Sequence, residues 1–223
     1  MSEPRVSTLL FRNIPLLALL SEAQCETAAT LAQRRTVRRG QTIIAAGDRP
    51  NCLYIIVSGA AQAVLSDREG NNIIVAVLKS GDYFGEMELI ENLPISSSIV
   101  AREACELLTL DKAWFSQCIE ENFDMAMMLL RGMARRLRES DERIGSLAMQ
   151  GVDARLAKFL LHEAQWVDGA RVVNCGFSKR DIGRMIGASR ERVSRVMKQM
   201  QVRGLIEERG KSILLREQIL SLA

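Results

Sequence analysis

The segment from residue 177 to residue 211 constrains the fold of this chain most, because its local signals specify two short helices and a tight turn. Ser178 stands where the first helix begins, and Asp181 three residues later completes a weak capping box. Gly187 ends that helix, since glycine readily takes the left-handed conformation that a sharp turn needs. Ser189 then caps the second helix. Two helices of this length joined by a Gly-containing turn predict a helix-turn-helix.

Apolar residues recur along both expected helices with the spacing of a single buried face. In the first helix they stand at i, i+3 and i+4, and in the second they continue this pattern over several turns. They are Ile182, Met185 and Ile186 in the first helix and Val193, Val196, Met197 and Met200 in the second. A small β-ribbon with its turn at residues 209–211 is expected next, and the last dozen residues read as a short helix.

The polar face of the second helix is basic and also carries one acid. Residues 178 to 211 contain ten Lys or Arg and four Asp or Glu, a net charge of +6; the chain as a whole carries +3, so its other residues sum to −3. The guanidinium groups of Arg190 and Arg195 can each donate two hydrogen bonds to O6 and N7 of guanine, and Glu191 can accept a hydrogen bond from cytosine N4. This pattern predicts a DNA-reading helix. The alternative is a solvated helical face with salt bridges such as Glu191 to Arg195.

Ser189, Arg190, Glu191, Val193 and Arg195 follow the pattern Ser-Arg-Glu-x-Val-x-Arg. With these residues the segment resembles the DNA-binding motif of the CRP/FNR family, the cAMP receptor protein-like transcription factors. The resemblance implies binding to palindromic double-stranded DNA with TGTGA-like half-sites, which Arg190, Glu191 and Arg195 would read. It also implies RNA polymerase as a partner.

The same resemblance implies a set of phosphate contacts, which fix the register of a protein on DNA but carry no sequence information. The expected phosphate contacts are Ser178, Lys179, Ser189, Lys198 and Arg209. Arg192 stands where the best-known family member has a small polar residue. We therefore add Arg192 to the DNA-binding candidates and expect a different preference next to the core half-site.

Residues 36–110 change to the pattern of an all-β domain. Short β-branched runs alternate with Gly, Asp and Asn turns, which predicts an antiparallel barrel or jelly roll. The turns fall at Gly40, Gly47–Asp48, Gly59, residues 68–71 and Gly81–Asp82. The run resembles the cyclic-nucleotide-binding β-roll of the CRP/FNR family at Gly47–Asp48, Tyr54, Ile56, Gly59, Gly81–Asp82 and residues 84–86. The two matched modules stand in family order, and the resemblance covers about residues 15 to 215.

Two helical segments flank the β-rich region. Residues 8–36 look helical, with Ser21 and Gln24 as a capping box. Residues 124–149 form the longest predicted helix, and apolar or small residues alternate along it at spacings of four and three. This seam is made of Ala126, Leu130, Met133, Leu137, Ser140, Ile144 and Leu147. It predicts a parallel homodimer, which would provide the two-fold symmetry that paired half-sites need; the alternative is a helix packed on its own β-roll.

The fold class that follows is α+β, with three parts. A helical lead-in and a β-roll sensor occupy residues 1–123, a long dimerisation helix and hinge residues 124–150, and a winged helix-turn-helix residues 151–223. Residues 150–153 read as the hinge: Gly151 permits an unusual backbone angle, and Asp153 can cap the next helix, expected over residues 154–166.

The β-roll departs from cyclic-nucleotide-binding members in its ligand site. The resemblance implies that in those members a glutamate binds the ribose hydroxyl. An Arg-Ser pair binds the cyclic phosphate, with help from backbone amides of the same turn. Gly85, Glu86, Ser96 and Ser97 match this site, but the phosphate arginine falls on Ile95. An isoleucine forfeits a strong charge-assisted hydrogen bond. The departure argues against the usual cAMP binding.

A second departure lies in the long helix. Where cAMP-binding members place two hydroxyl residues against adenine, this chain has Ser140 and Asp141, and Arg136 stands at a family position near the phosphate. A carboxylate can accept both N–H groups on the Watson–Crick edge of guanine. The sequence therefore favours cyclic di-GMP or another guanine nucleotide over cAMP as the effector. The alternatives are a non-nucleotide effector or none, and Asp141 can equally be an exposed acid paired with a neighbouring arginine.

Composition and cysteine spacing exclude several other classes. No apolar run approaches the roughly 20 residues of a membrane span, and the N-terminal stretch does not read as a signal peptide. Five cysteines without CxxC spacing and a single histidine, His162, predict reduced thiols in a cytoplasm and no metal site or fixed cofactor.

No catalytic constellation stands out, so we predict a regulator and not an enzyme. The remaining competitor is a cyclic-nucleotide-binding protein that acts on a protein partner and never touches DNA. The +6 charge of residues 178–211 argues against it.

Overall fold

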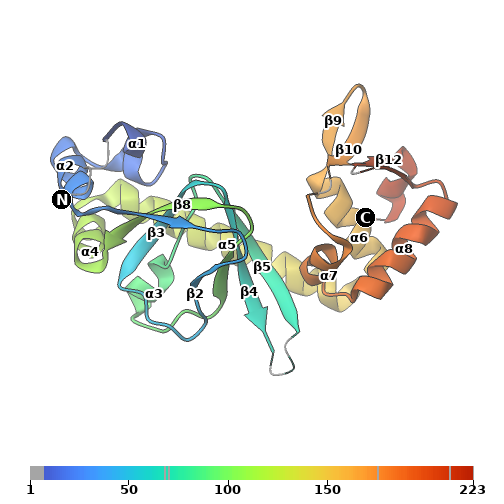
Figure 1. Ribbon diagram of the computed structural model, residues 1–223, viewed down its shortest axis with the longest axis horizontal. Coiled ribbons are helices and arrows are strands. Elements are labelled where there is room, and N and C mark those ends of the chain that lie inside the picture. The colour runs from blue at the N-terminus through green and yellow to red at the C-terminus, as the bar shows by residue number, and fades with distance from the viewer. Residues whose placement is uncertain (1–7, 68, 70, 175, 211, 223) are drawn as a thin grey trace. The chain divides into compact units, whose positions relative to one another are not determined.

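The computed structural model describes residues 8–67, 69, 71–174, 176–210 and 212–222 (Figure 1). The chain forms two compact units, Met1–Arg135 and Arg136–Ala223. Parts of the predicted turns at residues 68–71 and 209–211, and the fifth cysteine, Cys175, lie outside the described residues. The division into three parts at residues 123 and 150 stays a prediction.

The first unit begins with short helices, α1 (Thr8–Arg12), the 3-10 helix η1 (Leu17–Leu19) and α2 (Glu22–Leu31). The predicted capping box is confirmed: the Ser21 hydroxyl accepts from the Gln24 N–H, and the Gln24 side chain accepts from the Ser21 N–H. The prediction of helix up to residue 36 was wrong. Residues 33–37 form strand β1, because they pair in antiparallel register with Cys105–Thr109, which come much later in the chain.

Two four-stranded antiparallel sheets form the predicted β-roll, with strand orders β1-β8-β3-β6 and β2-β7-β4-β5. The strands are β1 (Gln33–Val37), β2 (Thr42–Ile44), β3 (Cys52–Ser58), β4 (Ala60–Ser66), β5 (Asn72–Lys79), β6 (Tyr83–Phe84), β7 (Ser98–Ala101) and β8 (Cys105–Asp111). Between β6 and β7 the chain forms a short helix, α3 (Glu86–Glu91). Side chains from both sheets share one apolar core, in which the Tyr54 and Phe84 rings stack at 4.9 Å.

Two helices follow the β-roll, α4 (Lys112–Glu121) and α5 (Phe123–Met149). The start of α5 is anchored: Met125 and Leu129 are buried in the cluster that also holds α1, α2 and α4. The predicted seam is largely exposed in the single chain, with Leu137 at 64% and Ile144 at 65%. The start of α5 therefore packs in the first unit, while Leu130, Leu137 and Ile144 of the predicted seam stay more than half exposed in the single chain.

In its described residues, the second unit contains three more α-helices, one 3-10 helix and a four-stranded sheet of order β11-β12-β10-β9. Its elements after α5 are α6 (Val152–Glu163), β9 (Gln165–Val167), β10 (Ala170–Asn174), α7 (Lys179–Ile186), α8 (Arg190–Val202), β11 (Ile206–Arg209), β12 (Ser212–Leu215) and the 3-10 helix η2 (Glu217–Leu222). The expected C-terminal helix is thus η2, and its Ile219 is fully buried in the core of this unit.

The structure differs from the prediction at the hinge, residues 150–153, in the backbone of Gly151 and in the capping residue of α6. Gly151 has an ordinary extended backbone (φ −65°), so it does not need the freedom of glycine, and it is Gly151 that occupies the N-cap position of α6. Asp153 lies inside the first turn of α6 and is not its cap. The helix ends at Glu163 instead of residue 166, because the chain turns into the β9–β10 hairpin, which the sequence did not predict.

The described cysteines, Cys25, Cys52, Cys105 and Cys118, are free thiols. The His162 imidazole is 85% exposed and lies 3.0 Å from the Glu163 carboxylate. In the part of the chain that is described, no helix has both the length and the apolar character to cross a bilayer.

Candidate nucleic-acid interface and ligand site

Local hydrogen bonds define both helices of the helix-turn-helix. The Ser178 hydroxyl accepts from the Asp181 N–H at 3.2 Å and the Asp181 carboxylate accepts from the Ser178 N–H at 3.1 Å, which confirms the capping box of α7. Gly187 ends α7 in the left-handed conformation, with φ of 65°. The Ser189 hydroxyl accepts from the Arg192 N–H at 3.2 Å, so α8 begins at Arg190. The turn therefore has the geometry that the sequence predicted.

Burial of one side of α8 fixes which side faces outward. The four predicted apolar positions of α8 are all buried and pack with Ile182 and Ile186 of α7 and with β11 and β12. Because these positions occupy one stripe of the helix, the residues at the opposite stripe must face solvent. That outward stripe is the candidate DNA-binding surface.

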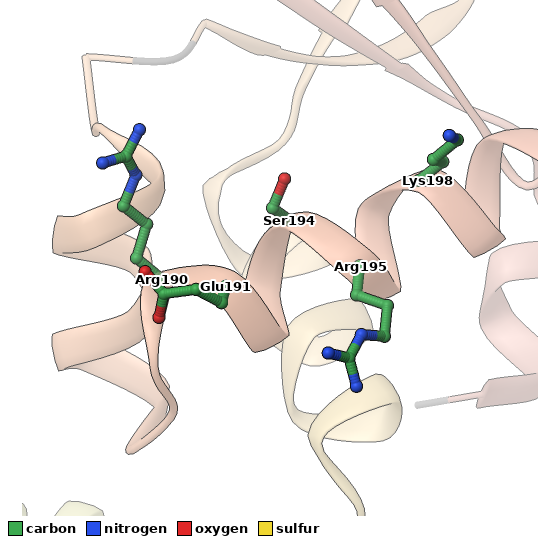
Figure 2. Close-up of a pocket in the computed structure, with 5 residues that line it drawn as sticks. All are labelled: Arg190, Glu191, Ser194, Arg195 and Lys198. Carbon is green, nitrogen blue, oxygen red and sulfur yellow. The ribbon is translucent and has the colours of Figure 1, made fainter.

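An open groove of about 470 Å³ runs along the outward stripe and is lined by Arg190, Glu191, Ser194, Arg195 and Lys198 (Figure 2). Ser194 and Lys198 project from the same side of the helix, and the Arg195 guanidinium extends away from them. The groove thus brings together the predicted base-reading residues and one predicted phosphate contact. Its open form and its charged and polar side chains suit the edge of a nucleic acid more than an enclosed small molecule.

For two residues, the lining of the groove differs from the predicted set of DNA-binding residues. Arg192 is exposed but is not among the residues that line the groove. Ser194 lines the groove although the sequence analysis did not single it out. The available signal was its position four residues after Arg190 and four before Lys198, which places all three on one helical face.

Glu191 is held as a carboxylate at the start of α8. Hydrogen bonds from its own backbone N–H and from the Ser189 side chain lower the pKa of Glu191, and the nearby charge of Arg190 adds to this. The positive end of the helix dipole acts in the same direction. The alternative ion pair between Glu191 and Arg195 is not formed among the described residues. Glu191 is therefore an acceptor that remains open to an outside donor.

The predicted phosphate contacts have different surroundings. Lys179 Nζ lies 3.2 Å from the Glu208 carboxylate, and Arg209 Nε lies 2.8 Å from the Glu207 carboxylate. The Ser178 hydroxyl also donates to Asp181 at 2.7 Å. Of the three cations among these contacts, Lys179 and Arg209 are thus paired with carboxylates, whereas Lys198 has no carboxylate partner within ion-pair distance in the described chain.

In the first unit, the predicted ligand residues lie around α3 and the loop before β7. Gly85 has φ of 89° and precedes the first residue of α3, Glu86, which is only 2% exposed. Ser96 is exposed and Ser97 is half-buried. A deeply buried carboxylate at a helix start is typical of a site residue, because burial is costly unless the charge is bonded.

Ile95 belongs to the core of the β-roll and not to an open site. Its side chain is 4% exposed and packs in the cluster shared by both sheets. Its backbone N–H donates to the Asp48 carbonyl and its carbonyl accepts from the Gly47 N–H, each at 2.8 Å. The position of the family's phosphate arginine is thus occupied by an apolar side chain that points into packed protein.

The remaining ligand candidates, Arg136, Ser140 and Asp141, lie on the part of α5 that belongs to the second unit. The Ser140 hydroxyl donates to the Arg136 carbonyl at 2.8 Å, one turn earlier. Asp141 is exposed to solvent. No group of three or more His, Cys, Asp or Glu side chains that could hold a metal ion is found over the described ranges.

Comparison with known families decides what this architecture is. Residues 34–122 match the family model of the cyclic nucleotide-binding domain, and residues 154–221 match that of the Crp-like helix-turn-helix domain. The two matches together span more than half of the chain and stand in the order in which the β-roll and the helix-turn-helix occur. The chain belongs to the CRP/FNR family.

Relatives with an established role support this membership. The chain is 35% identical over 177 residues to the cAMP-activated global transcriptional regulator CRP of Salmonella typhimurium, which covers 78% of this chain and 84% of that protein. It is 32% identical over 188 residues to the cAMP-activated global transcriptional regulator Vfr of Pseudomonas aeruginosa, covering 81% and 88%. This CRP/FNR protein is therefore a DNA-binding transcription regulator and not an enzyme, as its sequence predicted.

Solved structures share the fold of this CRP/FNR protein at lower identity. FixK2 from Bradyrhizobium japonicum superposes with a TM-score of 0.73 at 24% identity, covering 86% of this chain and 96% of the other. The c-di-GMP responsive global regulator CLP from Xanthomonas campestris gives 0.73 at 23% identity, covering 87% and 99%. These likenesses confirm the predicted arrangement of β-roll, long helix and helix-turn-helix.

Proposed function

We propose that this CRP/FNR protein binds palindromic DNA as a homodimer, with Arg190, Glu191 and Arg195 reading a TGTGA-like half-site. The observation that carries the proposal is the groove on α8, which gathers these three side chains on the face opposite the buried stripe. Arg190 and Arg195 would bind guanine and Glu191 would accept from cytosine. Ser178, Lys179, Ser189, Lys198 and Arg209 would contact phosphates, and Arg192 would act beside the core half-site.

The exposed seam of α5 supports the homodimer. Leu130, Leu137 and Ile144 recur every seven residues, and each is more than half exposed in the single chain. Such a heptad stripe fits a parallel partner helix. A second copy would also supply the second recognition helix for a half-site about 34 Å away.

Binding measurements with a fluorescent palindrome test the DNA-binding proposal. We expect tight binding to the palindrome, weaker binding to a scrambled duplex, and a steep loss of affinity as salt rises. Binding that is equal for both duplexes would contradict base reading by α8. A protein that binds neither duplex at low salt would instead support the alternative role, regulation of a protein partner.

We propose a guanine-type effector, cyclic di-GMP or another guanine nucleotide, in preference to cAMP. The relatives above are named cAMP-activated, but the apolar, buried Ile95 removes the charged donor that the family uses for the cyclic phosphate. Asp141 supplies an exposed carboxylate that can accept from the two Watson–Crick N–H groups of guanine. Gly85, Glu86, Ser96, Ser97, Arg136 and Ser140 are the other proposed contacts.

Isothermal titration with cAMP, cGMP and cyclic di-GMP separates the effector candidates. We expect heat only from the guanine ligands, and its loss in Asp141→Asn. Glu139→Gln, which removes a charge from the same helix, serves as the matched control and should leave binding unchanged. Flat traces for all three ligands would favour a non-nucleotide effector or none. RNA polymerase as the downstream partner, and the cytoplasm as the compartment, remain part of the same proposal.

A further inference from the structure

Two neighbouring glutamates on β11 hold basic side chains that are proposed to contact DNA. Glu207 accepts from Arg209 Nε at 2.8 Å and from Arg216 at 2.9 Å, through its two different carboxylate oxygens. Glu208 pairs with Lys179 Nζ of α7 at 3.2 Å. Each of these acids therefore engages one cation of the DNA-binding set, in the β-ribbon and at the start of the helix-turn-helix.

These ion pairs lie at the surface and can exchange partners. The side chains of the Lys179–Glu208 pair are 41% and 36% exposed, and those of the Arg209–Glu207 pair 63% and 42%. Exposed pairs of this kind are weak and screened by salt, so a phosphate group can displace the carboxylate. The hydrogen bond from Arg209 lowers the pKa of Glu207, so this acid stays ionised throughout the neutral range.

We propose that Glu207 and Glu208 compete with DNA phosphates for Arg209 and Lys179 and thereby lower the affinity for every DNA sequence. The inference rests on the proposed DNA-binding role of this unit. On binding, each cation exchanges a carboxylate for a phosphate, and the carboxylate left behind takes up a cation from solution. The net release of ions is then smaller than for a free lysine or arginine, which makes the salt dependence shallower.

Base reading should be unaffected, because phosphate contacts do not report sequence. The groove residues that would read bases form no ion pair with Glu207 or Glu208. The two acids thus set how tightly and how salt-dependently the protein binds DNA, while α8 sets which sequence it prefers.

The test is Glu208→Gln and Glu207→Gln in the full-length protein, measured on the palindrome and on a scrambled duplex over a series of salt concentrations. We expect each variant to bind both duplexes roughly two- to thirty-fold more tightly, from the usual strength of surface pairs counted twice per dimer. The salt slope should steepen by up to about 2 per dimer, one freed contact in each protomer. The ratio of the two affinities should not change.

Glu106→Gln is the matched control. Glu106 pairs with Arg34 at 2.9 Å in the first unit, so its substitution removes the same charge and also frees an arginine, but outside the DNA-binding unit. We expect its affinity and salt slope to match the unaltered protein. A second check places Glu208→Gln in a Lys179→Gln background, where the gain should disappear.

Three outcomes would overturn the inference: no tightening in either variant, tightening equal to that of Glu106→Gln, or a gain from Glu208→Gln that persists without Lys179. Failure of the unaltered protein to bind either duplex would instead refute the proposed DNA-binding function. Thermal unfolding of each variant shows that the measured protein is folded.

Discussion

A methyl group added at Gly183 tests how closely the two helices of the DNA-binding motif approach each other. Gly183 is buried in α7, and a Cβ atom there would lie 2.5 Å from the carbonyl oxygen of Ala188. Ordinary contact begins at 3.4 Å, and the opposing atom is backbone, so the turn between α7 and α8 has to move. The move would also disturb the hydrogen bond from the Ala188 N–H to the Gly183 carbonyl, which is 2.8 Å long.

The expected cost follows from two opposing effects. Overpacking a tight site costs about 1–3 kcal/mol, whereas alanine gains about 1 kcal/mol over glycine in a helix interior. Because the clash is with backbone, we expect Gly183→Ala to lower the free energy of unfolding by about 1–2 kcal/mol. For a unit of this size that is a fall in Tm of roughly 5–10 °C. Displacement of the turn should also weaken binding to the palindrome at temperatures where the variant is folded.

Gly145 provides the control, because it also lies within a helix but a Cβ there would meet no atom within 4 Å. Gly145→Ala should therefore raise the free energy of unfolding by up to about 1 kcal/mol, from helix propensity alone. Calorimetry or circular dichroism measures both variants under the same conditions. The reasoning would be refuted if Gly183→Ala were as stable as Gly145→Ala and bound the palindrome normally.

Three further predictions concern the groove and the long helix. Arg190→Ala should reduce the binding free energy for the palindrome by about 1–3 kcal/mol and relax the preference at one guanine. Lys198→Ala should lower the affinity for all duplexes alike and reduce the salt slope. An equal loss of affinity for specific and scrambled DNA in Arg190→Ala would contradict the base-reading role of Arg190. The lowered pKa of Glu191 means that its contribution to stability and to cytosine recognition is present at neutral pH and is lost only as the pH falls through a value below 4.5. Carbon NMR titration should find that midpoint, and Ser189→Ala should move it upward; an unchanged midpoint would remove Ser189 as a cause. Leu137→Lys should leave the fold of the protomer intact but yield monomers in sedimentation, while a dimer that persists would place the interface elsewhere.

The helix-turn-helix could be predicted from sequence because its signals are local. The cap at Ser178 involves Asp181 three positions away, and the cap at Ser189 involves Arg192. Gly187 terminates α7 through its own backbone conformation. None of these interactions depends on distant parts of the chain, so their spacing in the sequence already contains the geometry.

The two stretches that were misjudged depend on distant or strand partners. Residues 33–37 look compatible with a helix, but they form β1 because they pair with β8, which comes much later in the chain. The β9–β10 hairpin likewise completes a sheet whose other strands, β12 and β11, come after both helices of the motif. Strand formation depends on such pairing and burial more than on the intrinsic preference of the segment.

The sequence by itself determined the class of protein, the placement of the proposed recognition residues on one helix and the apolar residue at position 95. Only the tertiary structure decided that Ile95 lies in the β-roll core, that Arg192 lies outside the groove, and that Lys179 and Arg209 are held by Glu208 and Glu207. The reason is physical: which residues share a helical face follows from their spacing, whereas packing and charge pairing depend on which surfaces the folded chain brings within a few ångströms.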